Sequence, residues 1–354
     1  MDVKIISIHA MHNPGSVFQA YALQEYLSAE HNVKIIDYRP SYFYSEGSKL
    51  KLIVKKILWG RAYRSRNEKF VGFVKRNMNL TAKYESLDSL NSAKLVADVF
   101  MTGSDQLWNT DFPCGNDEAF YLSFAKCGKK ISYSTSVGKK IIDDVNLSIL
   151  KSRLPSFDAL SVREKSTSEQ LKAILEKNVA WVCDPVFLLS ASSYARFISK
   201  ENPIGKKYAM VYLLEASEKL NRVVEYYRSK GLYIVLAGGF TKRCECDLHI
   251  KDVGPEDFLS LIYHAEVVIS SSFHATAFCH IFHKDFVTFL PETNGERIES
   301  LLEESSLENR AIFVDGDLDM KKNDQPIDWF SIDNHLESYI ENSKAFLKKE
   351  LQYA

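Results

Sequence analysis

Short runs of apolar, β-branched residues alternate with amphipathic stretches along the first half of the chain. Residues 3–8 (VKIISI) predict a buried strand, residues 17–27 a helix with apolar side chains at helical spacing, and residues 33–37 the next strand. Further strands are predicted at residues 96–102, 130–134, 159–162 and 180–183, and a helix at residues 166–176. This β-α-β order is typical of a parallel sheet and places residues 9–16 where such sheets bind ligands.

The alternation stops at residues 185–207, where two prolines and a polar run indicate a linker. After the linker the pattern starts again. Strands are predicted at residues 208–214, 232–237, 266–270, 285–290 and 311–314, and helices at residues 219–230, 255–264, 274–283, 294–304 and 334–350. Each half therefore has the pattern of one α/β domain with a mostly parallel sheet.

We expect two α/β domains that face each other across a cleft, because clefts between domains are frequent ligand sites. The first domain is predicted at residues 1–184, the linker at 185–207, the second domain at 208–330 and a C-terminal helix at 331–354. The length of 354 residues favours two domains, since a single hydrophobic core rarely extends beyond about 250–300 residues.

The charge of the chain is close to neutral overall but very uneven. Lys and Arg number 45, Asp and Glu 46, and the net charge is −1, so no nucleic-acid partner is expected. Residues 49–83, however, contain eleven basic side chains and one acid, Glu68, which gives 11 − 1 = +10. The rest of the chain therefore carries −1 − 10 = −11.

Two interpretations of this basic stretch stay open. Residues 50–58 place apolar side chains on one helical face, with Lys51, Lys55 and Lys56 beside or opposite it. The stretch is either a solvated face of a domain helix or a peripheral contact with anionic lipid or a lipid-linked acceptor. The sequence shows no signal peptide and no membrane span. We expect a cytoplasmic protein, at the inner face of the cytoplasmic membrane if this stretch binds lipid.

Two polar clusters follow predicted strands of the first domain and are candidates for binding a polar ligand such as a sugar. The first cluster combines a glycine that permits close backbone approach with an amide one turn into the next helix. The second is dense in hydroxyl, carboxyl and amide groups and includes a tryptophan that can stack on a sugar ring. Their residues are Asn13, Gly15 and Gln19, and Ser104, Asp105, Gln106, Trp108 and Asn109.

Two further motifs have the chemistry of an anion site. Arg163 follows a predicted strand, and a guanidinium there suits a carboxylate or a phosphate. In the second domain a strand ends in hydroxyls before a predicted helix, where His274 lies near free N–H groups. The hydroxyls belong to Ser270, Ser271, Ser272 and Thr276. His280 and His283 are expected to be structural, and their spacing fits no common zinc pattern, so no metal is predicted.

The order of these motifs resembles the polysaccharide pyruvyl transferase family. The resemblance covers roughly residues 1–315. It rests on N-x-G with Q-A-Y-A-L, G-S-D-Q-x-W-N, S-V-R-E-K-S, C-D-P-V-F-L-L (183–189), G-P-E-D-F (254–258), S-F-H-A-T (272–276) and the stretch 296–307. It implies two Rossmann-like domains in a GT-B-like arrangement, with the acceptor on the first domain and the donor on the second.

The resemblance also implies a reaction. Phosphoenolpyruvate would donate a pyruvyl group, as a ketal, to hydroxyls of a sugar in a surface polysaccharide such as an exopolysaccharide or in its lipid-linked precursor, without a cofactor. His274 would be the acid or phosphate ligand, Asp105 the base or acceptor-orienting residue, and Arg163 the anion clamp. Many family members have an arginine two residues before the histidine, where this chain has Ser272. One expected anion contact is therefore missing.

Two alternatives stay open at this point. The first is a nucleotide-sugar-dependent glycosyltransferase of the same fold, in which Glu292 or Glu296 would bind a ribose. The second is a non-catalytic protein that binds a glycan or a partner of the same pathway.

Overall fold

Parallel strands form two large sheets in the computed structural model, which describes residues 1–43, 49–214, 218–290, 295–313, 315 and 317–352. The first sheet has the order β3 (Leu80–Tyr84), β2 (Asn32–Tyr38), β1 (Asp2–Ile6), β4 (Val99–Thr102) and β5 (Lys129–Ser132). Two short strands, β6 (Leu160–Val162) and β7 (Val179–Trp181), continue beyond β5 through the bridge between Ile131 and Ala159.

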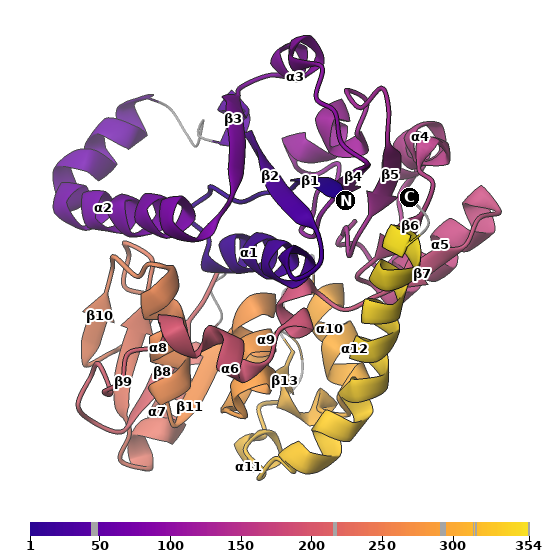
Figure 1. Cartoon of the computed structure of the whole chain (residues 1–354). Coiled ribbons are helices and arrows are strands. Elements are labelled where there is room, and N and C mark those ends of the chain that lie inside the picture. The colour runs from indigo at the N-terminus through magenta and orange to yellow at the C-terminus, as the bar shows by residue number, and fades with distance from the viewer. Residues whose placement is uncertain (44–48, 215–217, 291–294, 314, 316, 353–354) are drawn as a thin grey trace.

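The second sheet repeats the same winding and adds one strand. Its order is β10 (Leu248–Ile250), β9 (Tyr233–Ala237), β8 (Tyr208–Tyr212), β11 (Val267–Ser270), β12 (Asp285–Phe289) and β13 (Ala311–Ile312). In each sheet the strand order reverses beside the first strand, between β1 and β4 and between β8 and β11. Such reversals open a crevice at the carboxyl ends of the strands, and the two sheets place these ends at the junction of the domains (Figure 1).

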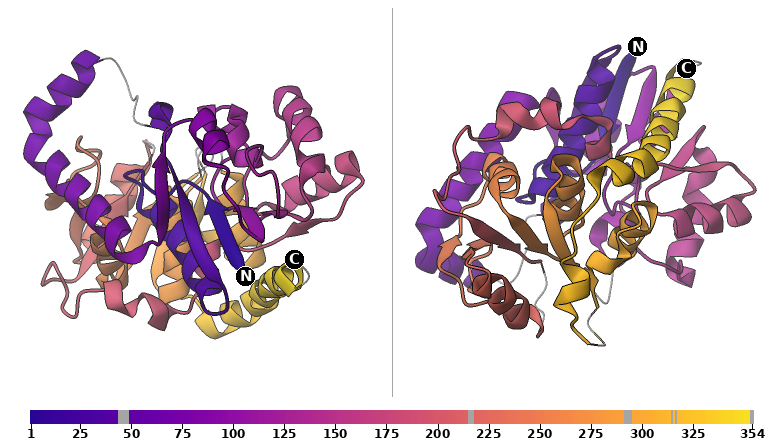
Figure 2. Two further views of the ribbon diagram at one scale, coloured as in Figure 1. Left: turned by 45° about the horizontal axis from the view of Figure 1, so that its top comes forward. Right: turned by 90° about the horizontal axis from the view of Figure 1, so that it is seen from below.

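Helices cover both sheets and confirm the predicted α/β class (Figures 1 and 2). They are α1 (Pro14–Ser28), α2 (Lys49–Asn77), α3 (Leu87–Ala93), α4 (Asp144–Arg153), α5 (Lys165–Leu175), α6 (Ala191–Tyr194), α7 (Leu220–Ser229), α8 (Pro255–His264), α9 (Phe273–Phe282), α10 (Glu296–Glu304), α11 (Met320–Asn323) and α12 (Trp329–Gln352). The sequence pattern missed α3, α4 and the strands β3 and β10, because most of their side chains are exposed or half-buried. It also missed the full length of α2.

The two helices that face the cleft begin at polar caps. The side chain of Asn13 accepts a hydrogen bond from the N–H of Gly15 at 3.0 Å and starts α1, with Pro14 in the first turn. Ser272 caps α9 in the same way and accepts from the N–H of Ala275. These caps fix where each loop ends and each helix begins, and so they fix the side chains at both helix starts.

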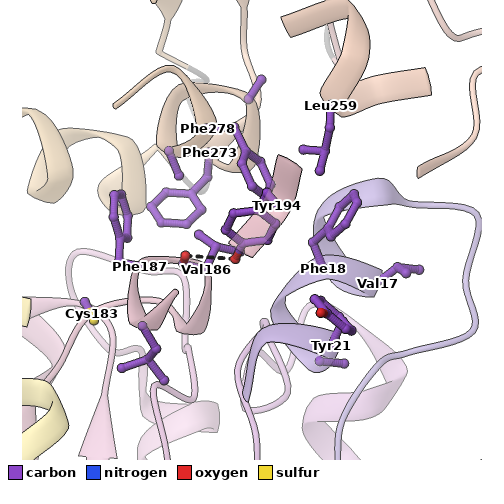
Figure 3. Close-up of a cluster of buried hydrophobic side chains, with 14 of the residues drawn as sticks. Val17, Phe18, Tyr21, Cys183, Val186, Phe187, Tyr194, Leu259, Phe273 and Phe278 are labelled. Carbon is purple, nitrogen blue, oxygen red and sulfur yellow. Dashed lines mark hydrogen bonds between the residues drawn. The ribbon is translucent and has the colours of Figure 1, made fainter. Parts of the chain in front are cut away.

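One apolar cluster runs through both domains. Figure 3 shows its centre, where Phe18 of α1 meets Tyr194 of α6 and Phe278 of α9. The three rings are in edge-to-face contact, with centroids 5.1–6.1 Å apart, and the Tyr194 hydroxyl donates to the carbonyl of Val186 at 2.9 Å. The domains therefore share a hydrophobic core.

The basic helix α2 crosses from the first domain to the second. Lys69 lies 2.8 Å from Asp257 and 3.1 Å from Asp252, and Arg76 lies 3.0 Å from Glu256. Part of the uneven charge of the sequence thus serves to dock the two domains. The other basic residues of this stretch include Lys51, Lys55 and Lys56, whose side chains lie outside the described residues.

Helix α12 leaves the second domain and returns to the first, as Figures 1 and 2 show. Its Glu350 pairs with Lys129 of β5 at 2.9 Å, and its Tyr339 hydroxyl donates to the carbonyl of Val182 at 2.8 Å. The hydroxyl of Ser343 accepts from the N–H of Cys183 at 2.8 Å. The helix begins five residues before the predicted start at residue 334 and ties the two domains together.

Candidate active site

A cavity of about 380 Å³ lies where the carboxyl ends of the two sheets face each other; we call it the inner cavity. Its walls are the segments after β1, β2, β4, β8 and β11 and the start of α10. The first domain contributes Ile8, Met11, Asn13, Ser16, Tyr42, Phe43, Asp105, Gln106, Phe112, Pro113 and Cys114. The second contributes Leu214, Ser271, Ser272, Phe273, His274, Arg297 and Ile298. Its position matches the crevice that the strand order creates.

A buried carboxylate links two of the predicted residues. Oδ2 of Asp184 accepts a hydrogen bond from Nη1 of Arg163 and lies 3.5 Å from Nε2 of His274. Burial alone would raise the pKa of Asp184, but the charges of His274 and Arg163 outweigh it and hold this pKa far below its usual value. Asp184 is therefore an anion at neutral pH, and it lies beside the imidazole ring that lines the inner cavity.

The His274 ring packs directly on the backbone of Gly15. A Cβ atom at Gly15 would lie 2.1 Å from Nδ1 of His274 and 2.4 Å from its Cγ. Real Cβ atoms do not approach other atoms so closely, so any larger residue at this position would displace the ring. This explains the glycine of the first motif: it lets the start of α1 approach the start of α9.

Asp105 lies across the inner cavity in a strained backbone conformation, with φ at 97°. Its Oδ2 accepts a hydrogen bond from the Ser16 hydroxyl at 2.6 Å, and its Oδ1 accepts from the N–H of Gln106 at 2.8 Å. Burial favours a raised pKa, but Arg163, the Ser16 hydrogen bond, His274 and Arg297 together lower it. The carboxylate is thus ionised and able to accept a hydrogen bond from a ligand hydroxyl.

Arg297, at the start of α10, supplies a guanidinium to the wall of the inner cavity. With the Gln106 amide turned to satisfy both partners, its oxygen accepts from Nη2 of Arg297 at 3.1 Å and from Nε at 3.2 Å. Burial and the nearby Arg163 lower the pKa of Arg297 to about 10, so it is still a cation at neutral pH. Two cations held close together in a buried site favour the binding of an anion.

Arg163 itself does not line the inner cavity. It is buried, it pairs with Asp184, and its guanidinium packs 4.6 Å from the centroid of the Phe273 ring. Its Nε and Nη2 find no hydrogen-bond partner among the described residues. Asp184 therefore lies between Arg163 and His274, and the arginine that lines the inner cavity is Arg297.

In the serine-rich turn before α9, some hydroxyls line the inner cavity and others hold the backbone of the turn in place. Ser271 and Ser272 line the inner cavity. Ser270 instead donates to the carbonyl of Tyr212 at 2.7 Å and accepts from the N–H of Ser272 at 2.9 Å. The hydroxyl of Thr276 donates to the carbonyl of Ser272 at 3.2 Å. Two of the four predicted hydroxyls thus hold the turn in place instead of facing the cleft.

Several residues predicted to bind the acceptor are buried behind the inner cavity. Gln19 donates to the hydroxyl of Ser7 and to two carbonyls. Ser104 donates to Asp184 at 3.0 Å. Trp108 is fully buried, stacks on Tyr121 and donates to a carbonyl at 3.2 Å. Asn109 is also fully buried. The prediction that Trp108 meets a sugar ring is wrong in this structure, because its apolar area is used in the core.

The comparisons with known proteins agree on fold and family. A sequence model of the family described as polysaccharide pyruvyl transferase matches residues 13–292. The chain belongs to the polysaccharide pyruvyl transferase family. It is accordingly a transferase of polysaccharide biosynthesis. A search of curated proteins finds no significant match to the sequence.

Solved structures similar to this polysaccharide pyruvyl transferase family member include UDP-GlcNAc 2-epimerases. The epimerase of Methanocaldococcus jannaschii, in complex with UDP-GlcNAc and UDP, has 13% identity and a TM-score of 0.53 over 100% of both chains. That of Rickettsia bellii has 10% identity and a TM-score of 0.56 over 99% of this chain and 96% of its own. That of Neisseria meningitidis has 9% identity and a TM-score of 0.52 over 99% and 100%. These similarities show the GT-B-like fold alone.

The structure brings to the site two residues that the sequence analysis did not single out. Asp184 lies in the C-D-P motif directly after β7, where a polar residue before a proline is a signal for a buried turn. Arg297 is one of two arginines among eight acids between residues 292 and 317. A pair of arginines in an otherwise acidic stretch was the available signal. It was missed because only the fold brings α10 beside α9.

Proposed function

We propose that this protein transfers a pyruvyl group from phosphoenolpyruvate to two hydroxyls of a sugar. The observation that carries the proposal is that Arg297, His274 and the capped start of α9 line one cavity. A guanidinium, an imidazole and helix N–H groups together suit a small molecule with a carboxylate and a phosphate. Phosphoenolpyruvate is such a molecule.

The donor would bind with its phosphate at the start of α9 and its carboxylate on Arg297. Ser271 and Ser272 lie at the first of these positions, and the N-terminal end of α9 favours negative charge. Arg297 takes over the anion contact that the family arginine would make at position 272. Because Arg297 already lies close to the cation Arg163, a bound carboxylate relieves the repulsion between them.

The first chemical step is proton transfer from His274 to the methylene carbon of phosphoenolpyruvate. The proton forms a methyl group and leaves an oxocarbenium-like carbon, which the bound anionic groups stabilise. Asp184 holds the imidazole in position, and Arg163 keeps Asp184 ionised. Arg163 is thus a positioning residue in this proposal.

In the second step a sugar hydroxyl attacks that carbon and releases its proton. Phosphate then leaves with the carbon–oxygen electron pair, and a second hydroxyl attacks to close the ketal and releases its own proton. One of the two protons restores His274 and the other goes to phosphate or solvent. Asp105, whose pKa is lowered, is a weak base, so we assign it the role of orienting the attacking hydroxyl through a hydrogen bond.

The test is release of inorganic phosphate from phosphoenolpyruvate in the presence of candidate sugar acceptors. His274→Asn should reduce turnover by about 10²–10⁴-fold while phosphoenolpyruvate still binds. Full activity of His274→Asn would remove this residue from the mechanism. His264→Asn, a substitution of a surface histidine bonded to the carbonyl of Ser199, is the matched control and should keep full activity.

A nucleotide-sugar donor is the competing proposal, since the similar epimerases bind UDP-GlcNAc. Thermal shifts separate the two donors: phosphoenolpyruvate should raise the melting temperature of the wild type but not of Arg297→Gln. Stabilisation by nucleotide sugars alone would favour a glycosyltransferase. No stabilisation by either class would favour a non-catalytic binding protein.

Glu292, one of the two acids proposed for a ribose, lies outside the described residues.

We also propose that residues 49–83 contact an anionic membrane surface. Arg61, Arg64 and Lys75 of α2 are exposed, and Lys69 and Arg76 dock the second domain. Exposed cations attract anionic lipid headgroups. Among the described residues no helix is long and apolar enough to cross a bilayer, so the proposed contact is peripheral, at the inner face of the cytoplasmic membrane.

A further inference from the structure

A second and larger cavity, of about 780 Å³, lies next to the inner cavity; we call it the outer cavity. Its lining comes from both domains and includes the first turns after β1 and β2, the middle of α2 and the segment after β9. Four residues line both cavities: Met11, Asn13, Phe43 and Leu214. The two cavities are therefore adjoining parts of one cleft.

The outer cavity is cationic. Arg39, Arg66, Lys83 and Arg243 line it, and none of the described lining residues is acidic. Two of these cations have partners outside the lining: Arg39 pairs with Asp37 at 2.5 Å and Lys83 with Glu85 at 2.5 Å. No described carboxylate lies within ion-pair distance of Arg243, which is exposed. Four cations from four chain segments thus converge on one space.

The outer cavity also has aromatic walls. Tyr63 of α2 and Phe240 face each other with ring centroids 6.3 Å apart, and Trp59 stacks on Phe240 at 5.5 Å. Gly238 and Gly239 before Phe240 have positive φ angles, which turn this loop toward α2. Aromatic rings beside cations offer an apolar face and charge in the same site.

We propose that the outer cavity binds a phosphate or diphosphate group attached to the acceptor glycan, while the sugar to be modified enters the inner cavity. Converging arginine and lysine side chains are suited to phosphate oxygens, and the aromatic walls are suited to the sugar rings beside them. This inference rests on the proposed function for the identity of the acceptor. The phosphate chemistry is shared by free sugar phosphates and lipid-linked diphosphates, and the experiment separates these sources.

The experiment measures binding of inorganic pyrophosphate, glucose, glucose 1-phosphate and glucose diphosphate with a short prenyl chain by calorimetry at about 150 mM salt. Pyrophosphate and the phosphorylated sugars should bind, and glucose should bind much more weakly. The double variant Lys83→Gln with Arg243→Gln should weaken binding of the phosphorylated probes about tenfold or more. Tighter binding of the prenyl compound than of glucose 1-phosphate would identify the lipid-linked source, and equal binding the free sugar phosphate.

The matched control is Lys75→Gln with Lys242→Gln. It removes the same charge from α2 and from the segment after β9, at exposed residues that do not line the outer cavity. It should leave binding of the phosphorylated probes within about twofold of the wild type. Equal affinity for glucose and glucose 1-phosphate, or equal losses in both double variants, would overturn the proposal.

Failure of this proposal is distinct from failure of the proposed function. Phosphoenolpyruvate binding depends on Arg297 in the inner cavity, and neither double variant changes a residue there. If the wild-type protein binds phosphoenolpyruvate but shows no preference for phosphorylated sugars, only the outer-cavity proposal is refuted. If the wild-type protein prefers phosphorylated sugars but does not bind phosphoenolpyruvate, only the donor proposal is refuted.

Discussion

The inner and outer cavities differ in how their positive charge is balanced. In the inner cavity Arg297 lies near Asp105, and Arg163 behind it pairs with Asp184. In the outer cavity none of the described lining residues is acidic, and the acids that pair with Arg39 and Lys83 lie outside the lining. A buried network of matched charges holds its groups in fixed positions. A more open set of cations favours capture of an anion, with strong dependence on salt.

We therefore expect the inner cavity to position the reacting groups and the outer cavity to capture the anionic group of the acceptor. Changes to the inner cavity should alter turnover, or the affinity for a small donor. Changes to the outer cavity should alter acceptor affinity. Substitutions in each cavity test this division.

The contact between Gly15 and His274 should give the largest effect. Gly15→Ala places a Cβ atom 2.1 Å from Nδ1 of His274, so the ring must leave its position beside Asp184. We expect kcat to fall by about 10³-fold, with binding of phosphorylated sugars in the outer cavity preserved. Phosphate release and calorimetry measure the two quantities.

Gly60→Ala is the matched control for this substitution. Gly60 also lies in a helix, α2, but a Cβ atom there would meet nothing within 4 Å. It should keep wild-type kcat. If Gly15→Ala also keeps it, the close packing on His274 has no role in turnover.

Helix α9 carries a second histidine, His280, which is buried in the core and does not line either cavity. Its titration should affect the stability of the protein. His280 is buried and lies 2.9 Å from the carbonyl of Thr276 and 3.0 Å from the hydroxyl of Ser305. Burial lowers its pKa from 6.5 to about 4, so the folded protein requires the neutral form. The stability that His280 confers is present above pH 6.5 and is lost as the pH falls toward 4, by about 3 kcal/mol.

Thermal unfolding between pH 7.5 and pH 4 measures this loss, and His280→Gln isolates it. The variant cannot take up a proton at this position, so its melting temperature should fall less with acid than that of the wild type. Parallel curves for the two proteins would show that His280 does not titrate in this range.

Arg297 tests whether the inner cavity holds the donor. Arg297→Gln keeps an amide that can bond to Gln106 but removes the cation from the cavity wall. The expected loss is about 2 kcal/mol of phosphoenolpyruvate affinity, or about 30-fold in Kd. Arg297→Lys should recover part of it. An unchanged Kd in Arg297→Gln would place the donor elsewhere.

The exposed face of α2 should give the smallest effects. Arg61→Gln and Arg64→Gln should each weaken the free energy of binding to anionic vesicles, measured by sedimentation, by about 1 kcal/mol. Turnover with a soluble acceptor should not change, because neither side chain lines a cavity. Lys242→Gln on the second domain is the control. Equal vesicle binding by all three variants and the wild type would exclude α2 as a membrane contact.

Most of the fold follows from the alternation of apolar runs along the chain. Buried strands such as β9 and β11 are almost entirely apolar runs, and the predicted bounds of α8 agree with the structure at both ends. The elements that the pattern missed, β3 and α3 among them, have mostly exposed or half-buried side chains. Hydrophobic periodicity contains little signal for such elements.

The candidate site was predictable only in part. Strand ends located His274 and Asp105, because their loops follow β11 and β4 directly. Sequence reasoning did not distinguish a tryptophan in the core from one in a cleft, so Trp108 was misplaced. Arg297 was missed because it reaches the cavity from a separate helix. Arg163 was predicted to bind the anion directly, but it packs on the ring of Phe273 and does not line the inner cavity. Tertiary packing, which the sequence does not reveal, decides this position.

The return of α12 to the first domain has a consequence for synthesis on the ribosome. Tyr339, Ser343 and Glu350 bond to Val182, Cys183 and Lys129 of the first domain, yet they are translated after the whole second domain. Until they emerge, the first domain lacks these contacts and exposes part of its apolar surface. Nascent chains of this protein should therefore remain dependent on holding chaperones until late in translation.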